Sequence, residues 1–236
     1  MRYVKDKTGR FSERPHYEPK ELDQACEKII VDFMRSQHGT MRLPIDTEDI
    51  KNLIERDTDY LDCYADLSEY GSDVEGVTIF QPGKKPIVKI SKKLTENDRY
   101  ENRLRTTLTH EYGHVHFHAY LFTLDQDQDS FFQNQKPQSL VSKRENILNA
   151  PVTDWMEWQA GYACGALLMP LSNIQKIAAA FLETNNHFGP ISPDGAKGSE
   201  LIAKVVETFK VSVEAAKIRL LKLEILGSER GPSLIS

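Results

Sequence analysis

The fold is decided by residues 105–118, which read RTTLTHEYGHVHFH. Within this stretch His110 and His114 stand four residues apart, so on an α-helix both imidazoles lie on one face and can bind the same metal ion. Glu111 lies about 100° around the helix from His110, beside that ion but outside its set of ligands. A carboxylate in this position can take a proton from metal-bound water, which is the chemistry of the HExxH pattern.

A chance pair of surface histidines would give the same pattern, but the motif lies inside a strongly helical segment that begins near Asn97, which favours the metal site. A catalytic zinc usually has three protein ligands and one open position, so a third ligand must come from elsewhere. The candidates are Asp154, Glu157, His187 and the carboxylates of a polar segment after the motif. Glu157 is favoured because it lies on a predicted helix with small and apolar residues on the same face, although a glutamate paired with a surface Lys or Arg is the alternative.

The part of the chain before the motif predicts helices and a hairpin. Residues 1–17 are predicted to form a flexible N-terminal arm. Apolar residues at three- and four-residue steps predict a helix from about Pro19 to Ser36, and Asp46 or Thr47 can cap a short helix. The runs GVTIF and PIVKI, separated by QPGKK, predict a β-hairpin.

After the motif, periodicity is lost, and residues 125–150 are predicted to be a long surface loop. A helix follows over DWMEWQAGYACGALLM and ends at Pro170. The domain that carries the motif is therefore expected to span residues 18–185. Residues 197–230 predict two helices joined by a tight turn, which resembles a helix-turn-helix.

Composition and charge indicate the cellular compartment of the protein and the kinds of partner it can bind. The 236 residues have a formal net charge of −5, which gives no indication of nucleic-acid or membrane binding. Three cysteines without a CxxC spacing do not form a disulfide framework. The charged N-terminus has no apolar stretch typical of a signal peptide, and the longest apolar run, near residues 163–171, is too short to cross a membrane. These features predict a cytoplasmic protein.

RTTLTHEYGHVHFH, followed by EWQAGYACGALLMP, resembles the ImmA/IrrE metallopeptidases, and the resemblance covers roughly residues 20–170. It implies an α+β, zincin-like core, in which a small β-sheet packs on the HExxH helix and further helices, with a small helical C-terminal extension. It also implies one zinc ion per chain, with His110, His114 and Glu157 as ligands and Glu111 as the general base.

The family often has Asn four residues after the ligand glutamate, where this chain has Gly161. An Asn there could orient a metal ligand through a hydrogen bond, so Asp154, a backbone carbonyl or a water must take that role, or the site is weaker. His118 lies one turn beyond His114 and could polarise a substrate carbonyl or orient a carboxylate. A partly buried histidine with a backbone partner is the alternative.

The resemblance suggests that the enzyme cuts a helix-turn-helix repressor. A non-enzymatic metal-binding regulator that uses the C-terminal helices to bind DNA is the alternative. The second of these helices offers Lys217, Arg219 and Lys222 against Glu214 and Glu224, so we expect it to dock a protein and not DNA.

A zinc deformylase is a further rival, because such enzymes also use HExxH-like helices. That family has an upstream ligand cysteine in a Gly-Cys-Leu setting. Neither Cys26 nor Cys63 lies in such a setting, which disfavours this reading.

Overall fold

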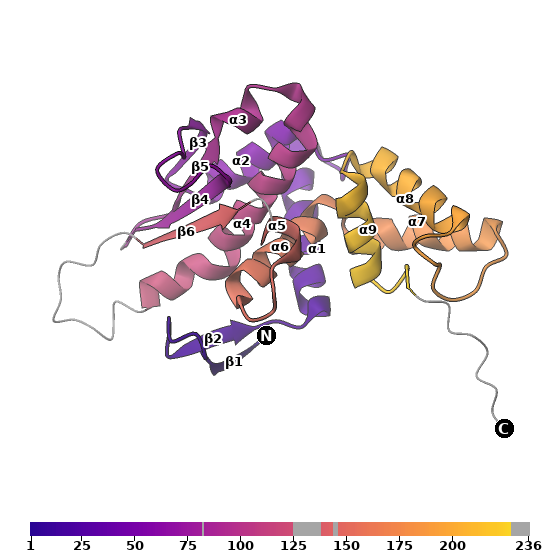
Figure 1. Cartoon of the computed structure of the whole chain (residues 1–236), viewed down its shortest axis with the longest axis horizontal. Coiled ribbons are helices and arrows are strands. Elements are labelled where there is room, and N and C mark those ends of the chain that lie inside the picture. The colour runs from indigo at the N-terminus through magenta and orange to yellow at the C-terminus, as the bar shows by residue number, and fades with distance from the viewer. Residues whose placement is uncertain (82, 125–137, 144–145, 228–236) are drawn as a thin grey trace.

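Helix α4 (Glu101–Leu124), which carries the His110–His114 pair, runs through the middle of the protein between a small sheet and a group of helices (Figure 1). The structure is a computed structural model that describes residues 1–81, 83–124, 138–143 and 146–227. Its α+β architecture agrees with the predicted fold class. The other elements, in chain order, are β1 (Arg2–Lys5), β2 (Glu13–His16), α1 (Pro19–His38), α2 (Thr47–Asp57), β3 (Tyr60–Ala65), β4 (Val74–Phe80), β5 (Ile87–Ser91), α3 (Lys92–Thr95), η1 (Asp98–Tyr100), β6 (Gln138–Lys143), α5 (Asn146–Asn149), α6 (Trp155–Leu168), α7 (Leu171–Thr184), α8 (Ala196–Phe209) and α9 (Val213–Lys222).

The larger sheet has the strand order β3-β5-β4-β6. Strand β4 is antiparallel to both β5 and β6, whereas β3 is parallel to β5. The β4–β5 pairing is the hairpin predicted from GVTIF and PIVKI. Every residue of β4 except Ile79 is buried, because this strand lies inside the sheet and contacts α4. The strand that lies against the HExxH helix is therefore held on both edges.

Strand β6 and helix α5 correct the prediction of a surface loop over residues 125–150. Residues 138–143 pair with β4, and Leu140 and Ser142 are buried. The segment QSLVSK is too short to show a clear period, and its partner strand is distant in the chain, so local sequence does not reveal it. Residues 125–137 and 144–145, which complete the predicted loop, lie outside the described residues.

Residues 1–17 form an antiparallel β-hairpin where the sequence predicts a flexible arm. The Asp6 carboxylate is buried in the turn and accepts hydrogen bonds from the backbone of Thr8 and Phe11. The Phe11 ring then contacts Phe122 and Trp155 with centroids 5.2 and 6.3 Å away. These contacts tie the hairpin to both α4 and α6.

Helix α6 packs closely against α4. A Cβ atom at Gly113 would lie 2.9 Å from the Cα atom of Ala160, so only glycine allows this separation of the two backbones. Apart from Trp158 and Gly165, all residues of α6 are buried. Gly113 thus permits the close approach of the two helices.

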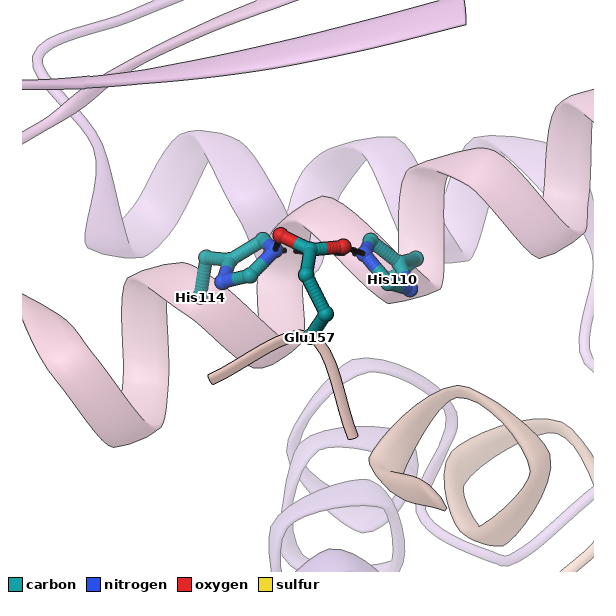
Figure 2. Close-up of side chains that lie close together, drawn as sticks. All are labelled: His110, His114 and Glu157. Carbon is teal, nitrogen blue, oxygen red and sulfur yellow. Dashed lines mark hydrogen bonds and ion pairs between the residues drawn. The ribbon is translucent and has the colours of Figure 1, made fainter. Parts of the chain in front are cut away.

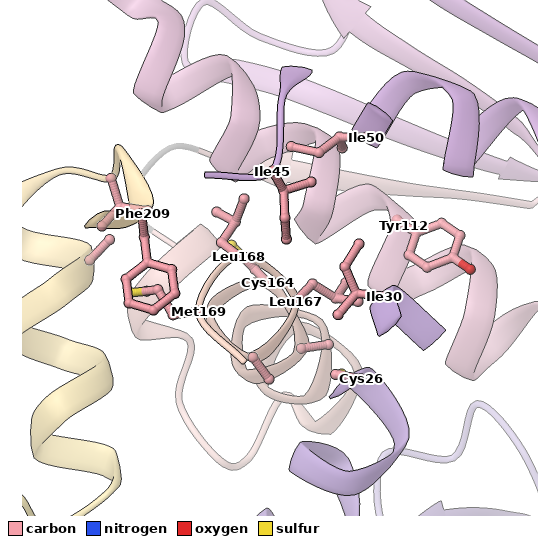
Figure 3. Close-up of a cluster of buried hydrophobic side chains, with 14 of the residues drawn as sticks. Cys26, Ile30, Ile45, Ile50, Tyr112, Cys164, Leu167, Leu168, Met169 and Phe209 are labelled. Carbon is pink, nitrogen blue, oxygen red and sulfur yellow. The ribbon is translucent and has the colours of Figure 1, made fainter. Parts of the chain in front are cut away.

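The C-terminal helices belong to the same core as α1 and α6 (Figure 3). Phe209 lies beside Met169, and Arg219 of α9 is only 2% exposed. The Arg219 guanidinium pairs with Asp23 of α1 at 2.6 Å and donates to the Met169 carbonyl at 3.3 Å. Helices α8 and α9 are joined by a short turn, and Ser212 caps α9. The packing of these two helices in the main core joins them to the rest of the protein.

Among the described residues, no single helix has the length and apolar composition to cross a membrane. Helices α6 and α7 meet that test only together, as a pair bent by 62°.

The Arg219–Asp23 pair gives a stability prediction. Arg219→Ala should lower the free energy of unfolding by about 3–5 kcal/mol, because it leaves the Asp23 carboxylate buried without its ion-pair partner. Lys217→Ala, which removes an exposed pair with Asp194 from the same helix, should cost no more than about 1 kcal/mol. Urea denaturation of the two variants measures the difference, and equal unfolding midpoints would contradict it.

Candidate metal centre

His110 and His114 of α4 and Glu157 of α6 converge on one point (Figure 2). The His110 Nε2 and His114 Nε2 atoms lie 3.1 Å apart. Each also lies 3.1 Å from one oxygen of the Glu157 carboxylate. One ligand atom from each residue falls within 4.8 Å of the others, and all three residues are buried. The structure thus brings together the three ligands that the resemblance implies.

The hydrogen bonds of His110 show that this cluster suits a cation. Its Nδ1 lies 3.2 Å from the carbonyl oxygen of Ile147, which can only accept, so Nδ1 carries the ring proton. A neutral ring then directs the lone pair of Nε2 toward the Glu157 carboxylate and His114 Nε2. Lone pairs that face one another in a buried site are unfavourable unless a positive charge lies between them. Two imidazoles and a carboxylate are a typical ligand set for a metal ion such as zinc.

Electrostatics point the same way. Burial alone would raise the pKa of the Glu157 carboxyl, but His114 and His110 outweigh burial and hold that pKa well below its usual range. Burial would likewise lower the pKa of His114, yet the Glu157 carboxylate raises it above its ordinary value. Glu157 is therefore anionic, and in the metal-free protein a proton on His114 competes with the metal.

Glu111 is fully buried, and its side chain contacts strand β4 of the sheet. Its Oε2 accepts a hydrogen bond of 2.6 Å from the Thr78 hydroxyl of β4, while Oε1 has no hydrogen-bond partner among the described residues. A Cβ atom at Gly76 would lie 2.2 Å from that Oε1, so the glycine makes room for the carboxylate. An acceptor that is buried, free and next to the metal ligands is what a general base requires.

The sequence offered no direct signal for Thr78 or Gly76. Both belong to the GVTIF run, which the residue pattern identifies only as a strand. Their role depends on the register of β4 against α4, which is a tertiary property.

The remaining candidates have other positions. His118 is fully buried, and its Nδ1 lies 3.1 Å from His114 Nδ1, on the side away from the Glu157 carboxylate. Burial, with a further contribution from His114, holds the pKa of His118 well below its ordinary value. Its two ring nitrogens contact His114 and Gln159. His187 lies in a loop after α7, with Nε2 3.3 Å from the Pro190 carbonyl.

Asp154 precedes α6 as its N-cap residue, and its exposed side chain makes no capping hydrogen bond. Its charge acts on the site, as one of the carboxylates that raise the pKa of His114. The support that Gly161 cannot give comes from the Ile147 carbonyl on His110 and from His118 on His114. A backbone carbonyl was one of the alternatives that the sequence left open.

A cavity of about 380 Å³ lies beside the centre and is lined by Thr107, Ile147 and Asn102, among others. Thr107 lies one turn before the ligand histidines on α4, and the carbonyl of Ile147 contacts His110. A larger cavity of about 750 Å³ between α8 and α9 also includes Asn102. The two cavities together extend from the C-terminal helices toward the cluster.

Comparison with known families gives one match. The Peptidase_M78 family model, described as the IrrE N-terminal-like domain, matches residues 72–221, which is more than half of the chain. The matched range includes α4, α6 and all three residues of the cluster. No curated protein matches the chain.

The cluster predicts metal binding with a defined stoichiometry. Metal-stripped protein titrated with zinc should bind about one equivalent, because two histidines and one carboxylate leave a single open position. His110→Ala and His114→Ala should each abolish tight binding, whereas His116→Ala, an exposed histidine of the same helix, should not. Retention of a full equivalent by both ligand variants would show that the ion is held elsewhere.

Proposed function

Because the chain belongs to the Peptidase_M78 family of IrrE N-terminal-like domains, it is a metallopeptidase, and we propose that it is a zinc-dependent endopeptidase with Glu111 as its general base. The observation that carries the proposal is the joint geometry of the cluster and Glu111. Two helices supply three converging ligands, and strand β4 holds a carboxylate beside them. The N/N/O ligand set favours zinc.

When bound, zinc would polarise the scissile carbonyl and lower the pKa of its water to about 7. Glu111 takes a proton from the attacking water through its free oxygen, Oε1, and later delivers that proton to the leaving amine. Thr78 keeps its hydrogen bond to Oε2 and so fixes the direction in which Oε1 points. Burial of the whole group keeps bulk water from competing for these contacts.

The roles of the two glutamates can be separated. Glu111→Gln should keep zinc and lower turnover about 10²–10⁴-fold, because an amide cannot accept the proton of the water. Glu157→Gln should lower the zinc affinity by more than about tenfold, because a neutral ligand replaces an anionic one. Zinc affinity by chelator competition and peptide cleavage are the two measurements, with Glu96→Gln on the exposed surface as the control. If Glu111→Gln lost zinc binding while Glu157→Gln bound zinc normally, the roles of ligand and general base would have to be exchanged.

For the substrate, we infer a helix-turn-helix repressor that is cut at one site. The family resemblance motivates this choice, and the pair of cavities supports a polypeptide substrate, because together they extend from α8 and α9 to the neighbourhood of His110. A segment of a folded protein could contact the C-terminal helices while an adjoining segment enters the metal centre.

The alternative function, a regulator that binds DNA through α9, is not favoured. Of its three basic side chains, Arg219 is buried in the pair with Asp23, and Lys217 is paired with Asp194. The ammonium group of Lys222 lies over the ring of Tyr162, 5.3 Å from its centroid. Specific DNA binding requires several cations that are free to contact phosphates.

Docking of the substrate on the C-terminal helices predicts a selective defect. Val213 is 63% exposed and lines the larger cavity, so Val213→Glu should slow cleavage of a full-length repressor at least about fivefold by placing a charge in an apolar contact. Cleavage of a short peptide that carries the same bond should be unchanged. Ala179→Glu, which adds the same charge at an exposed position of α7, is the control. Equal slowing of both substrates would exclude docking at this position.

A further inference from the structure

We propose that the N-terminal hairpin sets the tautomer of the metal ligand His114 through a buried chain of two side chains, Gln159 and His118. The inference rests on the proposed metal site. It goes beyond that site by making Gln159 a positioning residue and by including a segment outside the range that the family model matches.

The chain begins at Pro15 of β2. Its carbonyl oxygen accepts a hydrogen bond of 3.0 Å from Gln159, and a carbonyl can only accept, so the atom that faces it must be the Gln159 NH₂ group. The orientation of the Gln159 carboxamide is thereby fixed. Its oxygen, Oε1, points in the other direction, toward His118.

That oxygen determines the tautomer of His118. Its Nε2 lies 3.0 Å from Gln159 Oε1, which is an acceptor, so Nε2 carries the ring proton. The ring is fully buried and contacts an imidazole, a carboxamide and the edge of Trp155. With the ring proton on Nε2, the lone pair of the imidazole lies on Nδ1.

That lone pair faces His114. The two Nδ1 atoms lie 3.1 Å apart, so His114 Nδ1 must be the donor and carry the proton. His114 Nε2 is then left with a lone pair directed at the metal position, 3.1 Å from His110 Nε2. Hydrogen bonds of this kind orient a ligand imidazole and raise its basicity.

The hairpin is held in place by independent contacts. Phe11 packs edge-on against Trp155, and the Arg14 guanidinium lies over the same ring, 5.4 Å from its centroid. Trp155 in turn contacts the His118 ring, with centroids 5.4 Å apart. The hairpin thus presents the Pro15 carbonyl at a defined position next to α6.

The test compares zinc affinity in four variants. Gln159→Leu and His118→Leu should each lower the zinc affinity about 10–100-fold, because both leave His114 Nδ1 without an oriented hydrogen-bond acceptor. His118→Asn should retain more affinity than His118→Leu, since an amide oxygen can accept from His114 Nδ1. His116→Leu, an exposed histidine two residues away, is the matched control and should bind zinc normally. If Gln159 and His118 act only through His114, saturating zinc should restore kcat and KM in the Leu variants.

Nitrogen NMR of the zinc-loaded wild-type protein gives a second readout that needs no substitution. His114 should be protonated at Nδ1, and His118 should be neutral and protonated at Nε2. A proton on His118 Nδ1 would overturn the inference, as would wild-type zinc affinity in both Leu variants. If the wild-type protein fails to bind zinc, the proposed function itself is wrong; if it binds zinc and only these tests fail, the proposed function stands without this chain of contacts.

Discussion

The close packing of α4 against α6 is the constraint on which the site depends. Gly113 lies inside the HEYGH motif, and its missing side chain lets the backbone of Ala160 approach. A larger residue would push the two helices apart and displace Glu157 from the histidines, from which it lies 3.1 Å away. The same five residues therefore supply two of the proposed ligands, the proposed base and the contact that brings Glu157 within reach.

Burying four ionisable groups in one place is costly unless each has a partner. The partners come from segments that are far apart in the chain. Ile147 of α5 supports His110, Thr78 of β4 supports Glu111, and His118 supports His114. The exception is Oε1 of Glu111, which has no hydrogen-bond partner within the described part of the chain. An unsatisfied buried acceptor is unfavourable for folding, and here it coincides with the atom that the reaction needs.

The sequence predicted what helical periodicity determines. Four-residue spacing placed His110 and His114 together, and helix signals placed Glu157 on a second helix, where family resemblance was needed to select it. The hairpin of β4 and β5 followed from β-branched runs around a turn. Local patterns could not show that β6 pairs with β4, because Leu140 and Ser142 acquire their burial only from that partner. They could not show that Arg219 is buried either, since its partner Asp23 lies on the first helix.

Metal binding and folding are linked by this arrangement. The ligands lie on two helices, so a bound ion holds α4 and α6 together, and it stabilises the native state by about 4 kcal/mol when its concentration is 1,000 times the dissociation constant. The reverse also holds. Any change that loosens the contact between Gly113 and Ala160 should lower the metal affinity, because the separation of the two helices sets the distances between the ligands. A packing defect at this contact would therefore lower the stability of the metal-loaded protein by more than that of the metal-free protein, because it weakens metal binding as well as the packing of the helices. The difference in stability between those two forms measures how much of the fold the ion supports.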